Sequence, residues 1–324
     1  MIGSVSSTQS NESDNRVRAI VQACFVTILW SSSWVIIKFG LEEIPPLLFA
    51  GLRYFLASLL LVALVLSRSS SRKALRKRSS RWWIGLALYG GIFITATQGT
   101  QFLALKYLPA ITFSLLLNLT PIFVLILAIP WLRETPSLLE IVFIIISLLG
   151  VFLYFYPLDL VGLSLFGLMI GIVSLIANSF SSIIGRAINR IQDTPALIVT
   201  GISMFFGASM LILLALATET LVTLSLTSWI SIVWLAVVNT AFAFTLWNRS
   251  MQVLRAIDTT LINSTMMPQI VILSIIFLGE FPDLLDWLGL ILLALGITAV
   301  QVIQSRKKQL KPENIDSESS TGLI

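Results

Sequence analysis

The sequence has no histidine, one cysteine and few charged residues. Only 11% of its 324 residues are charged and 56% are hydrophobic, whereas soluble domains carry about 25% charged residues. Without histidine there is no imidazole for acid–base catalysis. Cys24 alone can form neither an internal disulfide nor a Cys/His zinc site. We therefore expect a membrane protein rather than an enzyme, with no metal and no cofactor.

The charged residues that do occur are mainly basic and stand between apolar blocks. The net charge is +5 and the pI is about 9.6, a balance that in a soluble protein would indicate a nucleic-acid partner. Cytoplasmic loops of membrane proteins are rich in Lys and Arg, so we interpret these residues as topology determinants and expect no nucleic-acid partner. Seven of them form one loop without acids, which we place in the cytoplasm together with both termini: Arg68, Arg72, Lys73, Arg76, Lys77, Arg78 and Arg81.

Ten apolar blocks are each long enough to span a bilayer, which takes about 20 residues in a helix. The blocks are too long and too continuously apolar for barrel strands, so they predict an all-α integral membrane protein with ten transmembrane helices. The polar ends, 1–18 and 305–324, are expected to be disordered cytoplasmic tails. The expected spans are 19–39, 44–67, 82–104, 110–132, 138–155, 160–184, 195–217, 229–251, 259–278 and 284–303.

The two halves of the chain, 19–156 and 157–304, resemble each other. Several landmarks recur at an offset of 146 residues, and each half holds five expected spans. An odd number of spans makes the second copy enter from the opposite face, which predicts inverted five-helix repeats related by a pseudo-two-fold axis in the membrane plane. Such repeats are common among transporters, which bind substrate near the midplane. The matching landmarks are Ala110 with Ala256, Glu134 with Glu280, and Gly150 with Gly296.

The chain resembles the EamA branch of the drug/metabolite transporter superfamily over nearly all of 19–304. The resemblance rests on ILWSSSWVIIKFG within 28–63, on TQFLALKYLPAITFSLLLNLTPIF within 100–134, and on NTAFAFTLWNRSMQVL and STMMPQIVILSIIFLGE within 235–280. It implies a central cavity and export or exchange of small polar metabolites such as amino acids, including aromatic ones. One departure concerns the proline of each half. With the offset of 146 residues, Met267 stands at the position that corresponds to Pro121, and Pro268 follows one residue later. We therefore expect a different bend in 259–278.

Polar and aromatic residues at mid-span are the candidate substrate ligands. Polar groups inside a membrane are unfavourable unless they face a cavity or another helix. For Ser and Thr, the alternative to substrate binding is close packing between helices. For Asn and Gln, the alternative is a hydrogen bond between helices. Deep tryptophans together with amides would suit a small amphipathic or zwitterionic solute. The candidates are Trp30, Ser33, Trp34, Gln98, Gln101, Asn118, Asn178, Ser181, Thr240, Phe244, Trp247, Asn263, Ser264 and Gln269.

Arg53 is the charged residue placed deepest in an expected span. An arginine at this depth could pair with a substrate carboxylate. It could equally extend toward the interface or bond carbonyls between helices, and we favour this structural role from sequence alone.

The sequence therefore predicts a secondary transporter in the cytoplasmic membrane that exports or exchanges small metabolites, with amino acids favoured, by alternating access. Its partners would be a small-molecule substrate and the lipid bilayer; a monomer would suffice, and a dimer stays open. A broad-range efflux carrier for amphipathic drugs or nucleoside-like solutes is the alternative. The acids lie near span ends or in loops, so we expect transport down the substrate's own gradient without a buried carboxylate that carries protons.

Overall fold

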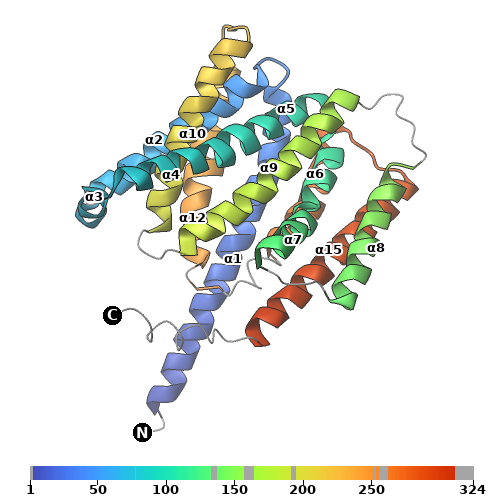
Figure 1. Cartoon of the computed structure of the whole chain (residues 1–324), viewed down its shortest axis with the longest axis horizontal. Coiled ribbons are helices and arrows are strands. Elements are labelled where there is room, and N and C mark those ends of the chain that lie inside the picture. The colour runs from blue at the N-terminus through green and yellow to red at the C-terminus, as the bar shows by residue number, and fades with distance from the viewer. Residues whose placement is uncertain are drawn as a thin grey trace.

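All regular structure in the described part of the chain is helical. The computed structural model describes residues 3–76, 78–132, 137–156, 164–190, 195–251, 253–254 and 262–310 (Figure 1). The first half contains α1 (Gly3–Gly40), α2 (Pro46–Ser67), α3 (Ser69–Arg76), α4 (Ser80–Gly90), η1 (Gly91–Gln98), α5 (Gly99–Tyr107), α6 (Ala110–Asn118), α7 (Thr120–Leu132) and α8 (Leu138–Tyr154). The second half contains α9 (Leu165–Arg190), α10 (Ala196–Thr218), α11 (Leu226–Ala236), η2 (Val237–Phe242), α12 (Ala243–Met251), α14 (Met266–Leu278) and α15 (Leu284–Leu310).

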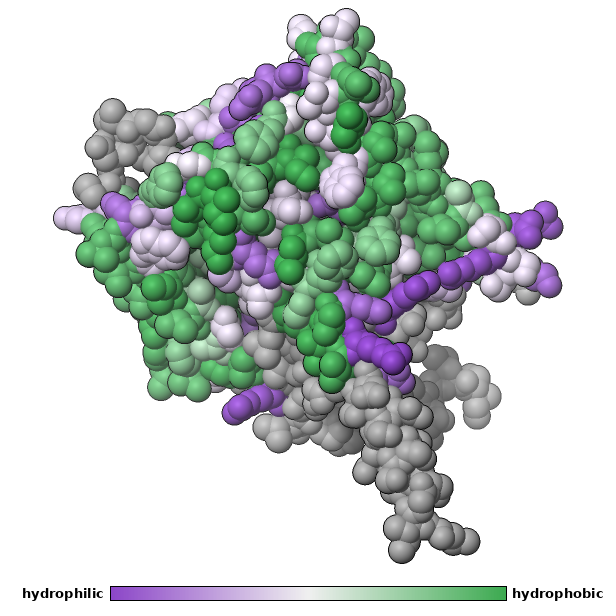
Figure 2. Space-filling view, turned by 180° about the vertical axis from the view of Figure 1, so that it is seen from behind, coloured by the Kyte–Doolittle hydropathy of each residue, from purple (hydrophilic) through white to green (hydrophobic). Residues whose placement is uncertain are grey.

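Within the described residues, seven helical stretches are long and apolar enough to cross a membrane, as judged by length and composition. Two further apolar helices, Leu138–Tyr154 and Ile262–Leu278, are shorter, and the run of α4, η1 and α5 covers the expected third span. Many large apolar side chains are exposed, and Figure 2 shows hydrophobic surface over much of one face. Such a surface suits contact with lipid. The all-helical membrane fold is thus confirmed. The seven stretches are Val17–Gly40, Pro46–Ser67, Ala110–Leu127, Leu165–Gly185, Leu197–Thr218, Leu226–Trp247 and Leu284–Ile303.

The two halves are interlocked. The first helix of each half packs against later helices of the other, since α1 contacts α12 and α14 while α9 contacts η1, α5 and α7. In addition, α2 packs along α10, and α8 packs along α15 at one side of the bundle (Figure 1). Any site between the halves is therefore built from both repeats.

The crossing of α8 and α15 obeys the sequence repeat residue by residue. A Cβ atom on Gly150 would lie 2.6 Å from the backbone nitrogen of Leu293, and one on Gly296 would lie 3.0 Å from that of Ser147. Leu293 and Ser147 are 146 positions apart, as are the two glycines. The backbones approach this closely only because neither glycine has a side chain. The contacts of one helix at this crossing are therefore repeated by the other helix at equivalent positions, as a two-fold repeat predicts.

Both halves also break a helix at the same place. The backbone N–H of Leu119 bonds the Leu116 carbonyl, and that of Thr265 bonds the Ile262 carbonyl, each three residues back. These pairs are 146 positions apart. Pro268 therefore leaves the break in register with that of the first half, and the different bend expected of 259–278 stays a prediction, because 259–261 lie outside the described residues. The hydroxyl of Thr265 also donates to the Ile262 carbonyl, at 2.6 Å, so this carbonyl accepts two hydrogen bonds at the break.

The expected third and eighth spans are not uniform α-helices. Their central segments, η1 and η2, are π-helical, and they begin at Gly91 and Val237, again 146 positions apart. The hydroxyls of Thr97 and Thr240 donate to the carbonyls of the residues five positions before them, at 2.9 and 2.8 Å. A π turn holds more residues than an α turn and is often found at functional sites.

Two carboxylates of the second half cap helices of the first half. Glu219 accepts hydrogen bonds at 2.9 and 2.8 Å from two backbone N–H groups in the first turn of α2. Glu280 accepts from the N–H groups of Ala110 and Ile111, at 2.7 and 2.9 Å, at the start of α6. Each helix follows a proline, whose side chain offers no acceptor. Both caps lie at the end of the bundle where α1 ends and α2 begins, which we call the distal end.

Two lysines bond backbone carbonyls at the same end. Lys38 Nζ donates to the carbonyls of Leu105 and Leu108, at 3.0 and 2.7 Å, where α5 ends. Lys106 Nζ donates to the Leu41 carbonyl. A cation at a helix C-terminus satisfies free carbonyls and complements the helix dipole. The distal end is thus held by charged side chains bonded to backbone groups.

Glu43 links the distal loop after α1 to the start of α11. Its carboxylate accepts from the hydroxyls of Ser225 and Ser228, each at 2.7 Å, and these bonds lower the pKa of Glu43 below its usual 4.5.

A carboxyl with a depressed pKa stabilises the folded state above its unfolded pKa, and this contribution is lost as the pH falls through the folded value. We expect Glu43→Gln to lower the Tm slightly at pH 6, and the difference to shrink as the pH falls below 4.5 and to vanish once Glu43 is protonated in the folded protein. Thermal unfolding in detergent across this pH range tests it. A Tm difference that does not depend on pH would contradict it.

Candidate substrate-binding site

A buried arginine joins the two halves near the middle of the bundle. Arg53, on α2, is 5% exposed, and its Nε donates to Thr240 Oγ1 of η2 at 3.0 Å. Its guanidinium carbon lies 5.0 Å from the centre of the Tyr54 ring and 5.9 Å from that of Phe102. In the described ranges, no carboxylate forms a salt bridge with it. The sequence placed Arg53 and Thr240 among the candidates, and the structure brings them into contact.

A second polar contact lies beside Arg53 in sequence. The Tyr54 hydroxyl donates to Gln98 Oε1 at 2.6 Å and so ties α2 to the end of η1. Gln98 and Gln101 are both half-buried. Tyr54 was not among the predicted residues, because a tyrosine in an apolar span reads as a core residue unless its hydroxyl partner is known.

An aromatic group lies between α1 and α12. The ring centres of Trp30 and Phe244 are 5.4 Å apart, and those of Trp30 and Trp247 are 5.1 Å apart. All three side chains are half-buried. Trp34 is different: it is buried and lies 5.4 Å from Phe113, inside the main hydrophobic core. The structure therefore assembles three of the predicted aromatic residues, which we call the aromatic trio, and places Trp34 in the core.

Asn239 is a buried amide that the sequence analysis missed. Its Nδ2 bonds the Leu29 carbonyl and Ser33 Oγ, the latter at 2.9 Å, which ties η2 to α1. Its Oδ1 is buried and has no hydrogen-bond partner in the described structure. Asn239 precedes Thr240 in the NTAFAF block, so its mid-span position was the available signal.

Other candidates serve contacts between or within helices. Gln269 bonds Ser31 and Thr27 of α1 at 3.0 and 3.1 Å. Asn178 of α9 donates to Thr120 Oγ1 of α7 at 3.1 Å. These two contacts lie at corresponding interfaces of the repeats, where the first helix of one half meets the helix after the break in the other.

Four further candidates have partners other than Arg53 or are exposed. Asn118 Nδ2 donates to the Ser114 carbonyl at 2.8 Å, within its own helix. Ser264 bonds Gln301 of α15 at 2.6 Å, and Asn263 is exposed. Ser181 is buried and hydrogen-bonded to the Tyr89 hydroxyl.

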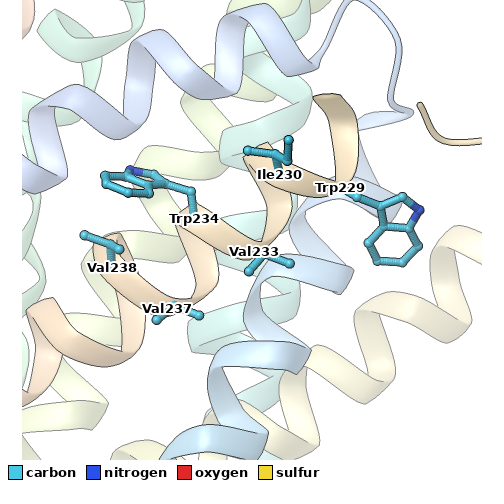
Figure 3. Close-up of a pocket in the computed structure, with 6 residues that line it drawn as sticks. All are labelled: Trp229, Ile230, Val233, Trp234, Val237 and Val238. Carbon is cyan, nitrogen blue, oxygen red and sulfur yellow. The ribbon is translucent and has the colours of Figure 1, made fainter. Parts of the chain in front are cut away.

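Neither of the two surface hollows described reaches Arg53. One, of about 400 Å³, is lined by apolar side chains of α11 and the start of η2, from Trp229 to Val238; Figure 3 shows them along a single stretch of helix. A hollow of this kind suits lipid chains rather than a polar substrate. The other, of about 350 Å³, lies at the distal end and includes Lys38, Lys106 and Glu280. A central cavity remains a prediction.

Comparison with known proteins places this arrangement among transporters. The model of the "EamA-like transporter family" matches residues 17–156 and 165–301. An uncharacterized transporter of Bacillus subtilis, YvbV, is 30% identical over 42% of this chain and 43% of its own length. A probable amino-acid metabolite efflux pump of Salmonella typhimurium is 26% identical over 69% of this chain and 75% of its own length.

The chain thus matches less than half the length of YvbV. A solved crystal structure aligns with 90% of this chain over 98% of its own length, with a TM-score of 0.63 and 19% sequence identity. Because the sequence identity is this low, the match supports the fold alone.

Proposed function

Since the chain belongs to the EamA-like transporter family, we propose that it exports or exchanges small metabolites, above all amino acids, by alternating access. In this proposal the chain crosses the cytoplasmic membrane ten times as two inverted repeats, with both termini in the cytoplasm. The substrate binds between the repeats, near Arg53 and the aromatic trio.

The contact of Arg53 with Thr240 is the observation that carries the proposal. It joins the two halves through a buried charge, and buried ionisable residues in membrane proteins commonly mark transport pathways. The aromatic trio likewise combines α1 of the first half with α12 of the second. A substrate held between these groups would contact both repeats and could follow their relative motion.

The nature of the groups favours a solute with a polar head and a compact apolar body. Arg53, Gln98 and Asn239 offer hydrogen bonds, and the trio offers ring faces. Amino acids have this form, and one relative is named as an amino-acid metabolite efflux pump. The same rings would also accept amphipathic drugs or nucleoside-like solutes, which are the second candidate class.

Counterflow in proteoliposomes tests the proposal. Vesicles are loaded with unlabelled amino acids, and uptake of labelled phenylalanine and threonine is followed without a pH gradient. We expect saturable uptake and a preference for phenylalanine. We also expect Trp30→Ala and Trp247→Ala to lower phenylalanine uptake about tenfold through lost ring contacts, while Trp234→Ala, on the exposed face of α11, leaves uptake unchanged.

Folded, inserted protein that takes up neither label would overturn the amino-acid assignment. Competition by amphipathic cations or nucleosides in place of amino acids would then favour the second class. Uptake that requires an imposed pH gradient would contradict transport driven by the substrate gradient alone.

A further inference from the structure

Arg53 is a buried cation whose hydrogen-bonding capacity is largely unused. A guanidinium has five N–H donors, and in the described structure only Nε has a partner, Thr240. Buried side-chain nitrogen and oxygen atoms without partners are confined, in the same residues, to Asn239 Oδ1 and Ser274 Oγ. The two terminal nitrogens of Arg53 are not among these fully enclosed atoms, although the residue as a whole is 5% exposed.

The guanidinium is held in one orientation. The Thr240 hydroxyl donates its single hydrogen to the Leu235 carbonyl at 2.8 Å, so its oxygen is left to accept from Arg53 Nε. Tyr54 lies under the charge, and its own hydroxyl is held by Gln98. With Nε engaged on one side and a ring beneath, the terminal nitrogens form a fixed fork, which is the geometry that binds a carboxylate through two parallel hydrogen bonds.

A purely structural role explains this geometry less well. An arginine that holds helices together in lipid satisfies its donors with carbonyls or pairs with an acid. Lys38 behaves in this way, bonding two carbonyls. Arg53 has neither kind of partner among the described residues, so its charge lacks a counter-ion until one arrives.

We propose that Arg53 binds the carboxylate of the transported solute, so that the substrates are monocarboxylates with an apolar body. Thr240, the partner of Arg53, lies on η2, and Phe244, a member of the aromatic trio, lies four residues later at the start of α12. A solute with its carboxylate on Arg53 can thus lay its body against the trio. This inference rests on the proposed transport function and names the chemical group that the site selects.

Competition with analogues that differ in one group tests the proposal. Counterflow of labelled phenylalanine is measured against unlabelled phenylpropionate, which keeps the carboxylate and lacks the amine, and phenethylamine, which keeps the amine and lacks the carboxylate. For the wild-type protein we expect phenylpropionate to compete at least tenfold better. For Arg53→Gln we expect phenylalanine uptake to fall at least tenfold and the preference between the two analogues to disappear. Arg53→Lys restores the charge without the fork and should recover part of both. Arg72→Gln, an exposed arginine on α3, is the matched control and should behave as wild type.

A binding measurement keeps the test decisive when a variant does not transport. The shift in Tm caused by phenylpropionate is measured in detergent for wild type and Arg53→Gln, after size-exclusion chromatography has shown that both are folded. Stabilisation of the wild type alone supports the proposal. Equal stabilisation of both proteins, or equal competition by the two analogues in the wild type, overturns it while amino-acid transport stands. Absence of phenylalanine uptake by wild type overturns the transport assignment instead, and the Tm shift then decides on Arg53 separately.

Discussion

Gly150→Leu is expected to prevent the protein from folding. A Cβ at this position would lie 2.6 Å from both the Gly289 carbonyl oxygen and the Leu293 backbone nitrogen, and backbone atoms cannot yield as a flexible side chain can. A leucine would have to force α8 and α15 apart along their length. Overpacking by a few methylenes already destabilises a core by about 1–3 kcal/mol, and here most of a side chain has no space. The yield of monodisperse protein in detergent and its Tm measure the effect.

Gly85→Ala is the matched control for this change. Gly85 also lies in a helix, but a Cβ there would meet nothing within 4 Å. We expect a neutral effect or a stabilisation of up to about 1 kcal/mol, because alanine is the better helix former. Gly150→Ala should fall between the two. Normal yield and Tm for Gly150→Leu would show that the helices are not in contact at this point in the membrane.

Glu280→Ala is expected to destabilise the protein by about 1–3 kcal/mol. The substitution removes a carboxylate that accepts two backbone N–H groups at the start of α6. Helix caps contribute about 1 kcal/mol, and hydrogen bonds to a charged group contribute about 1.5–3. The N-cap residue, Pro109, cannot replace the lost acceptor. Thermal unfolding in detergent should show a lower Tm for Glu280→Ala and a smaller loss for Glu280→Gln.

Glu42→Gln controls for the loss of a negative charge at the distal end. Glu42 is exposed and lines the same hollow as Glu280, so its substitution should leave the Tm within about a degree of the wild-type value. Equal Tm losses for the Glu42 and Glu280 variants would mean that net charge, rather than the cap, stabilises this end.

The sequence repeat predicted contacts at the helix crossings better than contacts at the site. Gly150 and Gly296 were paired from sequence alone, and their environments in the structure are exchanged as the repeat requires. The contact between Arg53 and Thr240 could not be predicted, because it joins residues 187 positions apart on helices whose packing sequence periodicity does not give. Gln269 shows the same limit: its amide bonds Thr27 and Ser31, a choice among partners that only the fold decides.

The π segments explain why residues spaced for one face of an α-helix contact two different helices. Thr240, Phe244 and Trp247, at positions i, i+4 and i+7, would share one face of a regular α-helix. The structure directs Thr240 to Arg53 on α2, and Phe244 and Trp247 to Trp30 on α1. The extra residue in a π turn rotates the later part of the helix relative to the earlier part. Asn239 lies in the same π segment as Thr240.

The matching starts of η1 and η2 also carry information about the ancestry of the chain. A π turn holds one residue more than an α turn, so a helix that gains one residue can accommodate it as a π turn. Because the two segments begin at equivalent positions, a single insertion in an ancestral half-length gene, made before that gene was duplicated, accounts for both. The shift of Pro268 relative to Pro121 is found in one half only and therefore followed the duplication. On this order of events, the irregular run of α4, η1 and α5 is older than the protein with two repeats.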